Sequence, residues 1–327
     1  MRFDFVVLGA TGMQGKIVTK DLLENGYSVL MCGRDKSRIL HLLKRYKKTG
    51  FEYVEMRDIE HVAKIIRNSK AEVVVNCIEG DWNLNAMKSC IKAKASVLDL
   101  GSEIWMTKKQ IEYDSLLKKK GITSITGCGS VPGVGNVMLR YAAEKFDKID
   151  TIECGFSWDS NIKKFVVPFS IQSIIEEFTD PAPIIQGCHI VKKIPLNSIT
   201  QDSFRAIGRQ NCFYVRHPET HTFYHYFKNK GLKNVRFYAG FPKHSFNKIM
   251  DMIELGFGSY DPVKVNNIKV VPAYFLTEVL KKLKIPKGYK EKENLWVWIH
   301  GRHNGRQKKI LMECIVPTLK GWEDAGC

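Results

Sequence analysis

The chain has 327 residues, which is enough for about two domains with full hydrophobic cores. Its hydrophobic fraction of 44% is ordinary, and no apolar run approaches the roughly 20 residues that cross a bilayer, so we expect no membrane partner. The formal net charge is +17, but the lysines are spread along the chain and no nucleic-acid-binding module carries them. We therefore expect no specific nucleic-acid partner and attribute most of the charge to solvated helix faces, which also attract anionic ligands.

Nine cysteines are scattered along the chain without a C-x-x-C pair. This pattern is typical of free thiols in a reducing compartment and not of a disulfide or zinc framework. The first residues enter a predicted strand directly, so we expect no signal peptide. The sequence therefore predicts a cytoplasmic protein.

The stretch 3–38 has the pattern of a strand, a tight turn, a helix and a second strand. An apolar run at 5–8 stops at Gly9, an amphipathic run opens at Lys16, and a second apolar run covers 28–31. Glycines at a spacing of three occupy the turn: Gly9, Gly12 and Gly15. A glycine triplet in this setting favours a dinucleotide-binding unit over a purely structural turn.

Each glycine has a separate role in such a unit. Gly9 permits the sharp turn, Gly12 removes the Cβ that would block a pyrophosphate, and Gly15 lets the helix press on the strand. The amino terminus of the helix offers free N–H groups and the positive end of its dipole to the phosphates. We therefore predict that the turn binds the cofactor, with Thr11 and Met13 among the contacts.

The end of the second predicted strand selects the cofactor. An acidic residue there would hold a ribose 2′-OH and favour NAD. Here the strand tip carries Arg34, followed by Asp35, Lys36 and Arg38. Cations suit a 2′-phosphate, and the Arg34 guanidinium can bond it bidentately, although Asp35 weakens the argument slightly. The sequence predicts NADP as the cofactor, with NAD and a merely solvated loop as the alternatives.

Strands and helices alternate through the first 130 residues. Further strands are predicted at 51–54, 72–77, 96–100 and 123–126, with helices at 37–46, from about 59 to 69, and at 82–93 and 108–120. Such alternation predicts an α/β fold, a Rossmann-type doubly wound parallel sheet.

From Asp150 onward the pattern becomes mixed. Helices are predicted at 169–178, 246–255 and 273–283, and short apolar runs between them, among them 204–207, predict strands. The runs 295–301 and 309–316 predict a hairpin with Asn304-Gly305 as its turn. We therefore expect two domains, a Rossmann domain over 1–129 and an α+β domain over 130–327.

Ligands of doubly wound sheets bind at the carboxyl ends of the strands. Asn76, Cys77 and Ile78 follow the fourth strand and are predicted to line the nicotinamide ribose. Cys77 is interpreted as a small buried residue, because no histidine stands near it in the motif. Asp58, after the third strand, either lies near the adenine or caps the helix that follows.

Hydride transfer needs one acid or base near the ends of the fourth and fifth strands. The carboxylates in this part of the sequence are Glu79, Asp81, Asp99 and Glu103. Asp99 closes the fifth strand and is the candidate acid or base, with helix capping or loop bracing as the alternatives. Glu79 is the second candidate, able to bind a substrate ammonium, with plain surface exposure as the alternative.

Anionic substrate groups have several candidate partners. A helix predicted over 133–146 opens near Gly133 and Asn136, and its amino terminus can seat a carboxylate. Arg216 or His217 can bind a carboxylate by charge. Three further arginines are anion candidates that the sequence does not rank: Arg205, Arg209 and Arg236.

A histidine tract is the only pattern that raises the question of a metal. His217, His221 and His225 are spaced by four, but Pro218 disfavours a helix through the tract. We therefore predict no metal site.

Several segments together resemble the saccharopine dehydrogenase family. These are the glycine-rich first turn, NCIEG at 76–80, LDLGSE at 98–103 and GCGSVPGVGNV at 127–137. In the second domain, SIQSIIEEFTDPAPIIQG at 170–187 and VRFYAGFPKHSFNKIMDMIELGF at 235–257 are similar to the saccharopine reductase and lysine dehydrogenase branch. The resemblance covers nearly the whole chain.

The resemblance implies a Rossmann domain joined to an α+β substrate and dimerisation domain. It implies NAD(P)-linked hydride transfer at a C–N bond of an amino acid or polyamine derivative, and a homodimer. Two features depart from the family: the return helix expected after the last hairpin is missing, since the chain stops at 321–327, and the segment 214–224 lacks a glycine-containing loop. The alternatives are an NAD-dependent lysine 6-dehydrogenase and a non-catalytic dinucleotide-binding protein.

Overall fold

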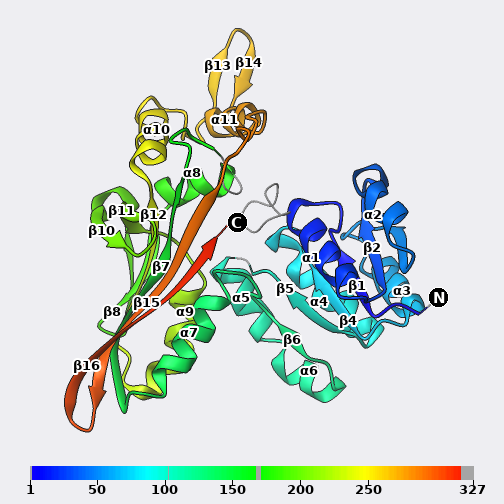
Figure 1. Ribbon diagram of the computed structural model, residues 1–327, viewed down its shortest axis with the longest axis horizontal. Helices are drawn as coiled ribbons and strands as arrows, with labels where there is room; N and C mark the ends of the chain where they lie inside the picture. Colours follow the sequence, from blue (N-terminus) through cyan, green and yellow to red (C-terminus); the bar gives the residue numbers. More distant parts are fainter. Residues whose placement is uncertain (1, 102, 167–170, 318–327) are drawn as a thin grey trace. The chain divides into compact units, whose positions relative to one another are not determined.

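The computed structural model describes residues 2–101, 103–166 and 171–317 (Figure 1). The chain divides into two compact units, Met1–Gly133 and Val134–Cys327. Two sequence expectations fall on residues outside the described ranges. One is the absence of a return helix, which concerns 321–327, and the other is the start of the helix predicted at 169–178, at positions 169 and 170.

The first unit contains a six-stranded parallel sheet in the order β3-β2-β1-β4-β5-β6. Its strands are β1 (Phe5–Leu8), β2 (Val29–Gly33), β3 (Thr49–Tyr53), β4 (Val73–Asn76), β5 (Ser96–Asp99) and β6 (Ser124–Ile125). This order reverses between β1 and β4, which makes their carboxyl ends the switch point where ligands bind. The predicted doubly wound sheet is confirmed.

Helices cover both faces of this sheet (Figure 1). They are α1 (Met13–Glu24), α2 (Leu40–Arg45), α3 (Ile59–Ser69), α4 (Asn83–Ala93), α5 (Ile104–Ile111) and α6 (Asp114–Lys120), with short 3-10 turns η1 (Lys36–Ile39) and η2 (Gly80–Trp82). Alternate residues of β1 enter two separate cores: Val6 and Leu8 lie in one cluster, and Val7 lies in the other. A parallel strand buried on both faces is therefore apolar without alternation.

The second unit is built on a mixed sheet in the order β10-β11-β12-β7-β15-β16, with β8 pairing to β12 and β9 to β8. Its strands are β7 (Lys148–Ser160), β8 (Ala182–Gln186), β9 (His189–Lys193), β10 (Thr200–Phe204), β11 (Gly208–Tyr214), β12 (Asn234–Phe241), β15 (Glu291–His303) and β16 (Arg306–Pro317). Strand β12 runs parallel to β7, and β15 runs antiparallel to it.

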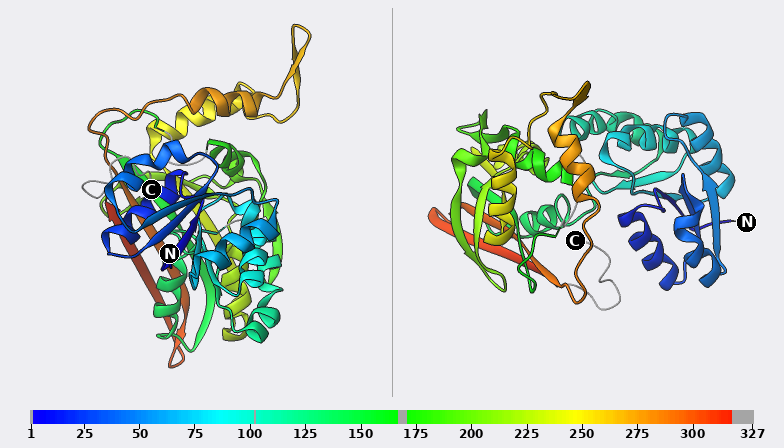
Figure 2. Two further views of the ribbon diagram at one scale, coloured as in Figure 1. Left: turned by 90° about the vertical axis from the view of Figure 1, so that its right-hand side faces the viewer. Right: turned by 90° about the horizontal axis from the view of Figure 1, so that it is seen from above.

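Five helices belong to the described part of this unit: α7 (Val134–Ala143), α8 (Ile171–Thr179), α9 (Glu219–Phe227), α10 (Lys243–Glu254) and α11 (Pro272–Leu280). Aromatic side chains fix α8 and α10 to one face of the sheet. Phe178 of α8 lies 4.5 Å from Phe213 of β11, and Phe246 of α10 lies 5.5 Å from Phe178, both between ring centroids. A second hairpin, β13 (Val263–Val265) and β14 (Ile268–Val270), stands away from the sheet beyond α11 (Figure 1 and Figure 2).

Three sequence expectations for this unit can be compared with the structure. The Asn304-Gly305 hairpin turn is confirmed, with φ of +49° and +74° at these residues. The strand predicted at 204–207 is wrong, because β10 ends at Phe204 and Ala206 adopts φ +70° in the following turn. Helix α9 was not expected, but it begins directly after Pro218, a position where proline is tolerated.

The described cysteines are free thiols. Cys128 in the first unit and Cys188 in the second are exposed, whereas Cys32, Cys90 and others are buried in the two cores. Across the described ranges, the helices are too short or too polar to span a membrane.

The buried carboxyl group of Glu293 on β15 makes stability depend on pH. Glu293 is 7% exposed, and burial, with a contribution from Glu291, raises its pKa from the ordinary 4.5 to about 7. Between these values the folded protein holds a proton that the unfolded chain has released. The free energy of unfolding therefore falls as the pH rises through this window.

We expect the free energy of unfolding of the wild type to fall by roughly 3 kcal/mol between pH 4.5 and pH 7.5 through this group. Glu293→Gln, which stays neutral, should remove most of that slope and stabilise the protein at pH 7.5. Urea unfolding at three pH values measures both effects, with the exposed Glu254→Gln as control. An unchanged slope in Glu293→Gln would contradict the assignment.

Candidate functional site

The glycine turn after β1 is pressed against the chain that follows β4. Gly9 adopts φ +78°, and a Cβ added there would lie 2.8 Å from Cγ1 of Ile78 and 3.0 Å from the carbonyl of Cys77. Both segments lie at the switch point of the sheet. No side chain larger than hydrogen fits at Gly9 without moving one of these segments.

Helix α1 approaches the same turn closely. A Cβ on Gly15 would lie 2.0 Å from the carbonyl oxygen of Gly9, and one on Gly12 would lie 3.2 Å from that atom. Gly12 is the N-cap of α1, Met13 is its first residue, and the first turn carries no acidic side chain. No carboxylate in the first turn of α1 neutralises the positive end of the helix dipole, and this favours the binding of a pyrophosphate at the turn.

Thr11 ties this turn to the end of β2. It is only 8% exposed, and a Cβ added to Gly33 would lie 2.7 Å from the Thr11 side chain. The small residue at the tip of β2 thus lets the turn pack against it. Arg34, the next residue, is exposed at this tip.

Asp35 is engaged with its own turn. Its Oδ1 accepts hydrogen bonds from the amide of Ser37 at 2.9 Å and from the Ser37 hydroxyl at 2.6 Å, which caps η1. These bonds lower the pKa of Asp35. Within the part of the chain that the structure describes, no ion pair joins Asp35 to Arg34. Asp35 therefore argues less strongly against the binding of a 2′-phosphate by Arg34.

Asn76, predicted to line the nicotinamide ribose, directs its side chain into the protein. It is fully buried, and its Nδ2 donates to Oδ1 of Asn83 at 2.8 Å, whose Nδ2 donates to the carbonyl of Gly101 at 3.1 Å. This chain of bonds fixes the turn after β4 against the turn after β5. Only Cys77 and Ile78 of the predicted trio, both half-buried, remain as side chains for a ligand at this edge.

The structure also describes the surroundings of Cys77 and Asp58. Burial raises the pKa of the Cys77 thiol to about 12, so it is uncharged at neutral pH. Asp58 accepts a hydrogen bond from the amide of His61 at 2.9 Å and caps α3, which is the alternative that the sequence left open. A contact of Asp58 with the adenine stays a prediction.

Asp99 is the most engaged carboxylate of the first unit. It is 2% exposed; its Oδ1 accepts from the amides of Gly101 at 2.9 Å and Gly127 at 3.0 Å, and its Oδ2 accepts from Nε2 of Gln110 at 2.7 Å. Burial raises the pKa of Asp99, and the three hydrogen bonds oppose this rise. The geometry corresponds to loop bracing.

The hydrogen bonds of Asp99 hold a compact cluster of glycines around Pro132. A Cβ on Gly101 or Gly127 would lie 2.5 or 2.9 Å from Pro132, and one on Gly133 would lie 2.0 Å from the carbonyl oxygen of Gly129. Gly133, with φ +139°, closes the first unit. Glu79, in contrast, is exposed in the turn before η2.

In the second unit, Arg216 already faces two carboxylates. Its guanidinium lies 2.9 Å from Oδ2 of Asp180 and 3.6 Å from Oε2 of Glu176. Its charge is therefore largely compensated before any substrate arrives. Asn136 on α7 places its Nδ2 3.5 Å from the Thr222 hydroxyl of α9.

His217 is held on two sides. Its Nδ1 is hydrogen-bonded to Oε2 of Glu219, and its ring stacks on Phe237 at 4.0 Å between centroids and 9° between planes. Glu219 is fully buried in the first turn of α9, and its Oε1 has no hydrogen-bond partner within the described residues. Sequence reasoning missed Glu219; the available signal was an acidic residue directly after a proline, which is typical of a helix start.

His221 and His225 lie along α9 with ring centroids 6.0 Å apart. Among the described residues, no three His, Cys, Asp or Glu side chains are grouped so that they could hold a metal ion.

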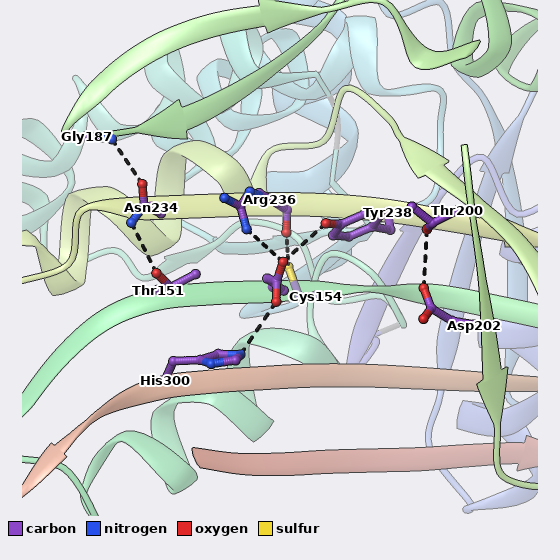
Figure 3. Close-up of polar contacts among 10 residues, drawn as sticks. Thr151, Cys154, Gly187, Thr200, Asp202, Asn234, Arg236, Tyr238 and His300 are labelled. Atoms are coloured by element: carbon purple, nitrogen blue, oxygen red, sulfur yellow. Dashed lines mark hydrogen bonds and ion pairs between the residues drawn. The ribbon is translucent and has the colours of Figure 1, made fainter. Parts of the chain in front are cut away.

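A polar cluster ties three strands of the second sheet (Figure 3). The Oε1 of Glu153 on β7 accepts from Arg236 at 2.8 Å and from the Tyr238 hydroxyl at 3.2 Å, both on β12, and Oε2 lies 3.5 Å from Nε2 of His300 on β15. Arg236, one of the unranked anion candidates, is thus paired within the sheet. Such cross-strand pairs stabilise the pairing of neighbouring strands.

Comparisons with known proteins agree with this fold. Residues 5–125 match the family model described as "Saccharopine dehydrogenase NADP binding domain". The solved saccharopine dehydrogenase (L-Glu forming) from Saccharomyces cerevisiae superposes with a TM-score of 0.75 at 11% identity, covering 98% of this chain and 86% of that one.

Two curated relatives extend over most of the chain. The carboxynorspermidine synthase of Vibrio cholerae is 26% identical over 287 residues, which are 81% of this chain and 67% of that protein. The carboxyaminopropylagmatine dehydrogenase of Synechocystis is 22% identical over 320 residues, 93% of this chain and 79% of that protein. The predicted resemblance and the NADP-binding domain are confirmed: residues 5–125 match the NADP-binding domain of saccharopine dehydrogenases, and the whole chain has the fold of a solved saccharopine dehydrogenase and is similar in sequence to enzymes that act on amines.

Proposed function

We propose that this protein transfers a hydride between NADP(H) and a C–N bond of a carboxylated polyamine derivative. The supporting observation is the glycine turn at the switch point, which is closely packed against α1 and the chain after β4 and lies at the tip of β2 next to an exposed arginine. The two relatives that span most of the chain are both named for carboxylated amines. An amino-acid substrate with a secondary amine is the nearest alternative within the same chemistry.

The bound dinucleotide supplies or accepts the hydride. In this proposal, the first turn of α1 holds the pyrophosphate and Arg34 bonds the 2′-phosphate. Asn76 and Asp99 hold the turns at the carboxyl edge of the sheet in place. Because both oxygens of Asp99 are occupied, we assign it a positioning role, and we assign the exposed Glu79 to the substrate ammonium.

Reducing a neutral C=N bond needs one proton in addition to the hydride. His217 is suited to supply it. When Nδ1–H is donated to the carboxylate of Glu219, Nε2 of the neutral ring is an acceptor, and it becomes a donor only after protonation. This arrangement fits proton transfer at an amine nitrogen better than the binding of a carboxylate that was predicted for His217.

The reaction is tested with the full chain, carboxynorspermidine and NADP, by following the absorbance of the reduced nicotinamide. We expect turnover with NADP that exceeds turnover with NAD. Turnover of lysine with NAD alone would instead identify a lysine 6-dehydrogenase. Tight NADPH binding without turnover of any secondary amine would identify a non-catalytic dinucleotide-binding protein.

Arg34→Ala should weaken NADPH binding by about 10- to 100-fold, because a charge-assisted bidentate contact is lost, and should leave NADH binding unchanged. Nicotinamide fluorescence titration measures both affinities. Lys44→Ala removes an exposed cation from α2 and is the matched control. Equal losses for NADPH and NADH would remove Arg34 from the 2′-phosphate site.

The acid or base is identified by two variants. Asp99→Asn keeps an acceptor for the amides of Gly101 and Gly127, so turnover should fall by less than about tenfold if Asp99 only positions the loop. His217→Asn should lower kcat by about 10²- to 10⁴-fold and leave the affinity for NADPH unchanged. The reverse pattern would return the acid-base role to Asp99.

We further propose a cytoplasmic homodimer. The free thiols support a reducing compartment. Apolar side chains of the β13–β14 hairpin and α11 are exposed, among them Ile268 at 68% and Phe275 at 54%, which favours association. Light scattering should give twice the chain mass of 37.4 kDa. A mass of one chain at micromolar concentration would contradict the dimer.

A further inference from the structure

Glu219 is a buried carboxylate in the second unit. It is the first residue of α9, directly after Pro218, and its side chain is fully buried. A carboxylate enclosed by protein is unfavourable unless charge and hydrogen bonds compensate for the lost water. Two groups compensate here: the positive end of the α9 dipole lies at this turn, and Nδ1 of His217 is hydrogen-bonded to Oε2 of Glu219.

Asp99 and Glu219 are both buried, but they are bonded differently. Asp99 accepts from two loop amides and one glutamine, so it braces the backbone. Glu219 bonds through its side chain to the imidazole of His217 alone, and its Oε1 is enclosed without a hydrogen-bond partner in the described part of the chain. A buried carboxylate that bonds to one imidazole is suited to orient that imidazole.

The ring of His217 is fixed by two neighbours. Phe237 stacks on its face, with 4.0 Å between centroids and 9° between planes, and so sets the plane of the ring. The hydrogen bond to Glu219 sets the rotation of the ring within that plane. Nε2 has no hydrogen-bond partner among the residues that the structure describes, and the His217 side chain is 15% exposed. Nε2 is therefore the ring nitrogen that remains for a ligand.

The same hydrogen bond decides which nitrogen carries the proton of the neutral ring. An imidazole is ordinarily a stronger base than a carboxylate, so a proton between Nδ1 and Oε2 resides on Nδ1. A neutral ring with Nδ1–H has an unprotonated Nε2, which can accept a proton. Glu219 also stabilises the imidazolium that forms when Nε2 is protonated, because the two charges are then opposite.

We propose that Glu219 is the positioning residue of His217. It keeps the proton of the neutral ring on Nδ1 and so presents the lone pair of Nε2 to the substrate nitrogen. In the direction of amine oxidation, Nε2 takes the N–H proton of the amine as the hydride leaves the neighbouring carbon and the C=N bond forms. In the direction of reduction, the imidazolium returns this proton. The proposal rests on the proposed acid-base role of His217.

Glu219→Gln separates this role from packing, because it keeps the shape of the side chain but can donate a hydrogen bond. A carbonyl oxygen can replace the unpartnered Oε1 without a new loss, whereas an NH2 group there would bury two unpaired donors. The NH2 group therefore faces Nδ1 of His217, which becomes an acceptor. The proton of the neutral ring then moves to Nε2, where it blocks the acceptance of a proton from an amine.

The tautomer is measured by NMR of the full chain labelled with 15N-histidine, since protonated and unprotonated nitrogens of a neutral imidazole differ in shift. The spectrum of His217→Asn identifies the resonances of His217. We expect Nδ1–H in the wild type and Nε2–H in Glu219→Gln, and no change in Glu254→Gln, which alters an exposed carboxylate of α10. A wild-type ring with Nε2–H would overturn the proposal, and this measurement needs no stable variant of Glu219.

Turnover gives the second measurement. Glu219→Gln should lower kcat by about 10²- to 10⁴-fold and leave the affinity for NADPH unchanged. Combined with His217→Asn, it should cause no further loss, because Glu219 acts only through His217. An unchanged kcat in Glu219→Gln, or losses that multiply in the double variant, would overturn the positioning role alone. An unchanged kcat in His217→Asn would instead contradict the proposed acid-base role, and the positioning role with it.

Discussion

The contact between the turn after β1 and the chain after β4 determines the geometry of the first unit. Gly9 is pressed against Ile78 and Cys77, and Gly15 brings α1 onto the same turn. The backbone of Gly9 therefore meets the Cys77 carbonyl and the Ile78 side chain at the point where the strand order reverses. The close packing of strand, turn and helix comes from these missing Cβ atoms, as a dinucleotide-binding turn requires.

The carboxyl edge of the sheet beyond this contact is held by buried polar side chains. Asn76 bonds to Asn83, which bonds to the Gly101 carbonyl, while Asp99 bonds to the Gly101 amide and to Gly127. The turns after β4, β5 and β6 thus share one hydrogen-bond network. A half-satisfied network in this position would be costly, since each group is shielded from water.

Local patterns explain which features were predictable. The glycine spacing, most of the apolar runs and the hairpin turn involve residues that are neighbours in the sequence, and the structure has them; the strand predicted at 204–207 is the exception. Two of the three partners of Asp99 lie 11 and 28 positions away, and Arg236 meets Glu153 across 83 positions. Sequence reasoning can name Asp99 and Arg236 as charged groups, but their pairing depends on the register of distant strands.

The distribution of thiols also provides a chemical handle. Cys128 and Cys188 are exposed, and one lies in each unit, whereas Cys32, Cys90, Cys154 and Cys212 are buried, which raises their pKa and keeps reagents away. Partial burial and Asp99 also raise the pKa of Cys128. Among the described cysteines, a maleimide dye at limiting concentration will react first at these two exposed positions. The unmodified chain therefore carries a natural pair of attachment points for fluorescence energy transfer, which can follow the separation of the two units while dinucleotide or amine is added.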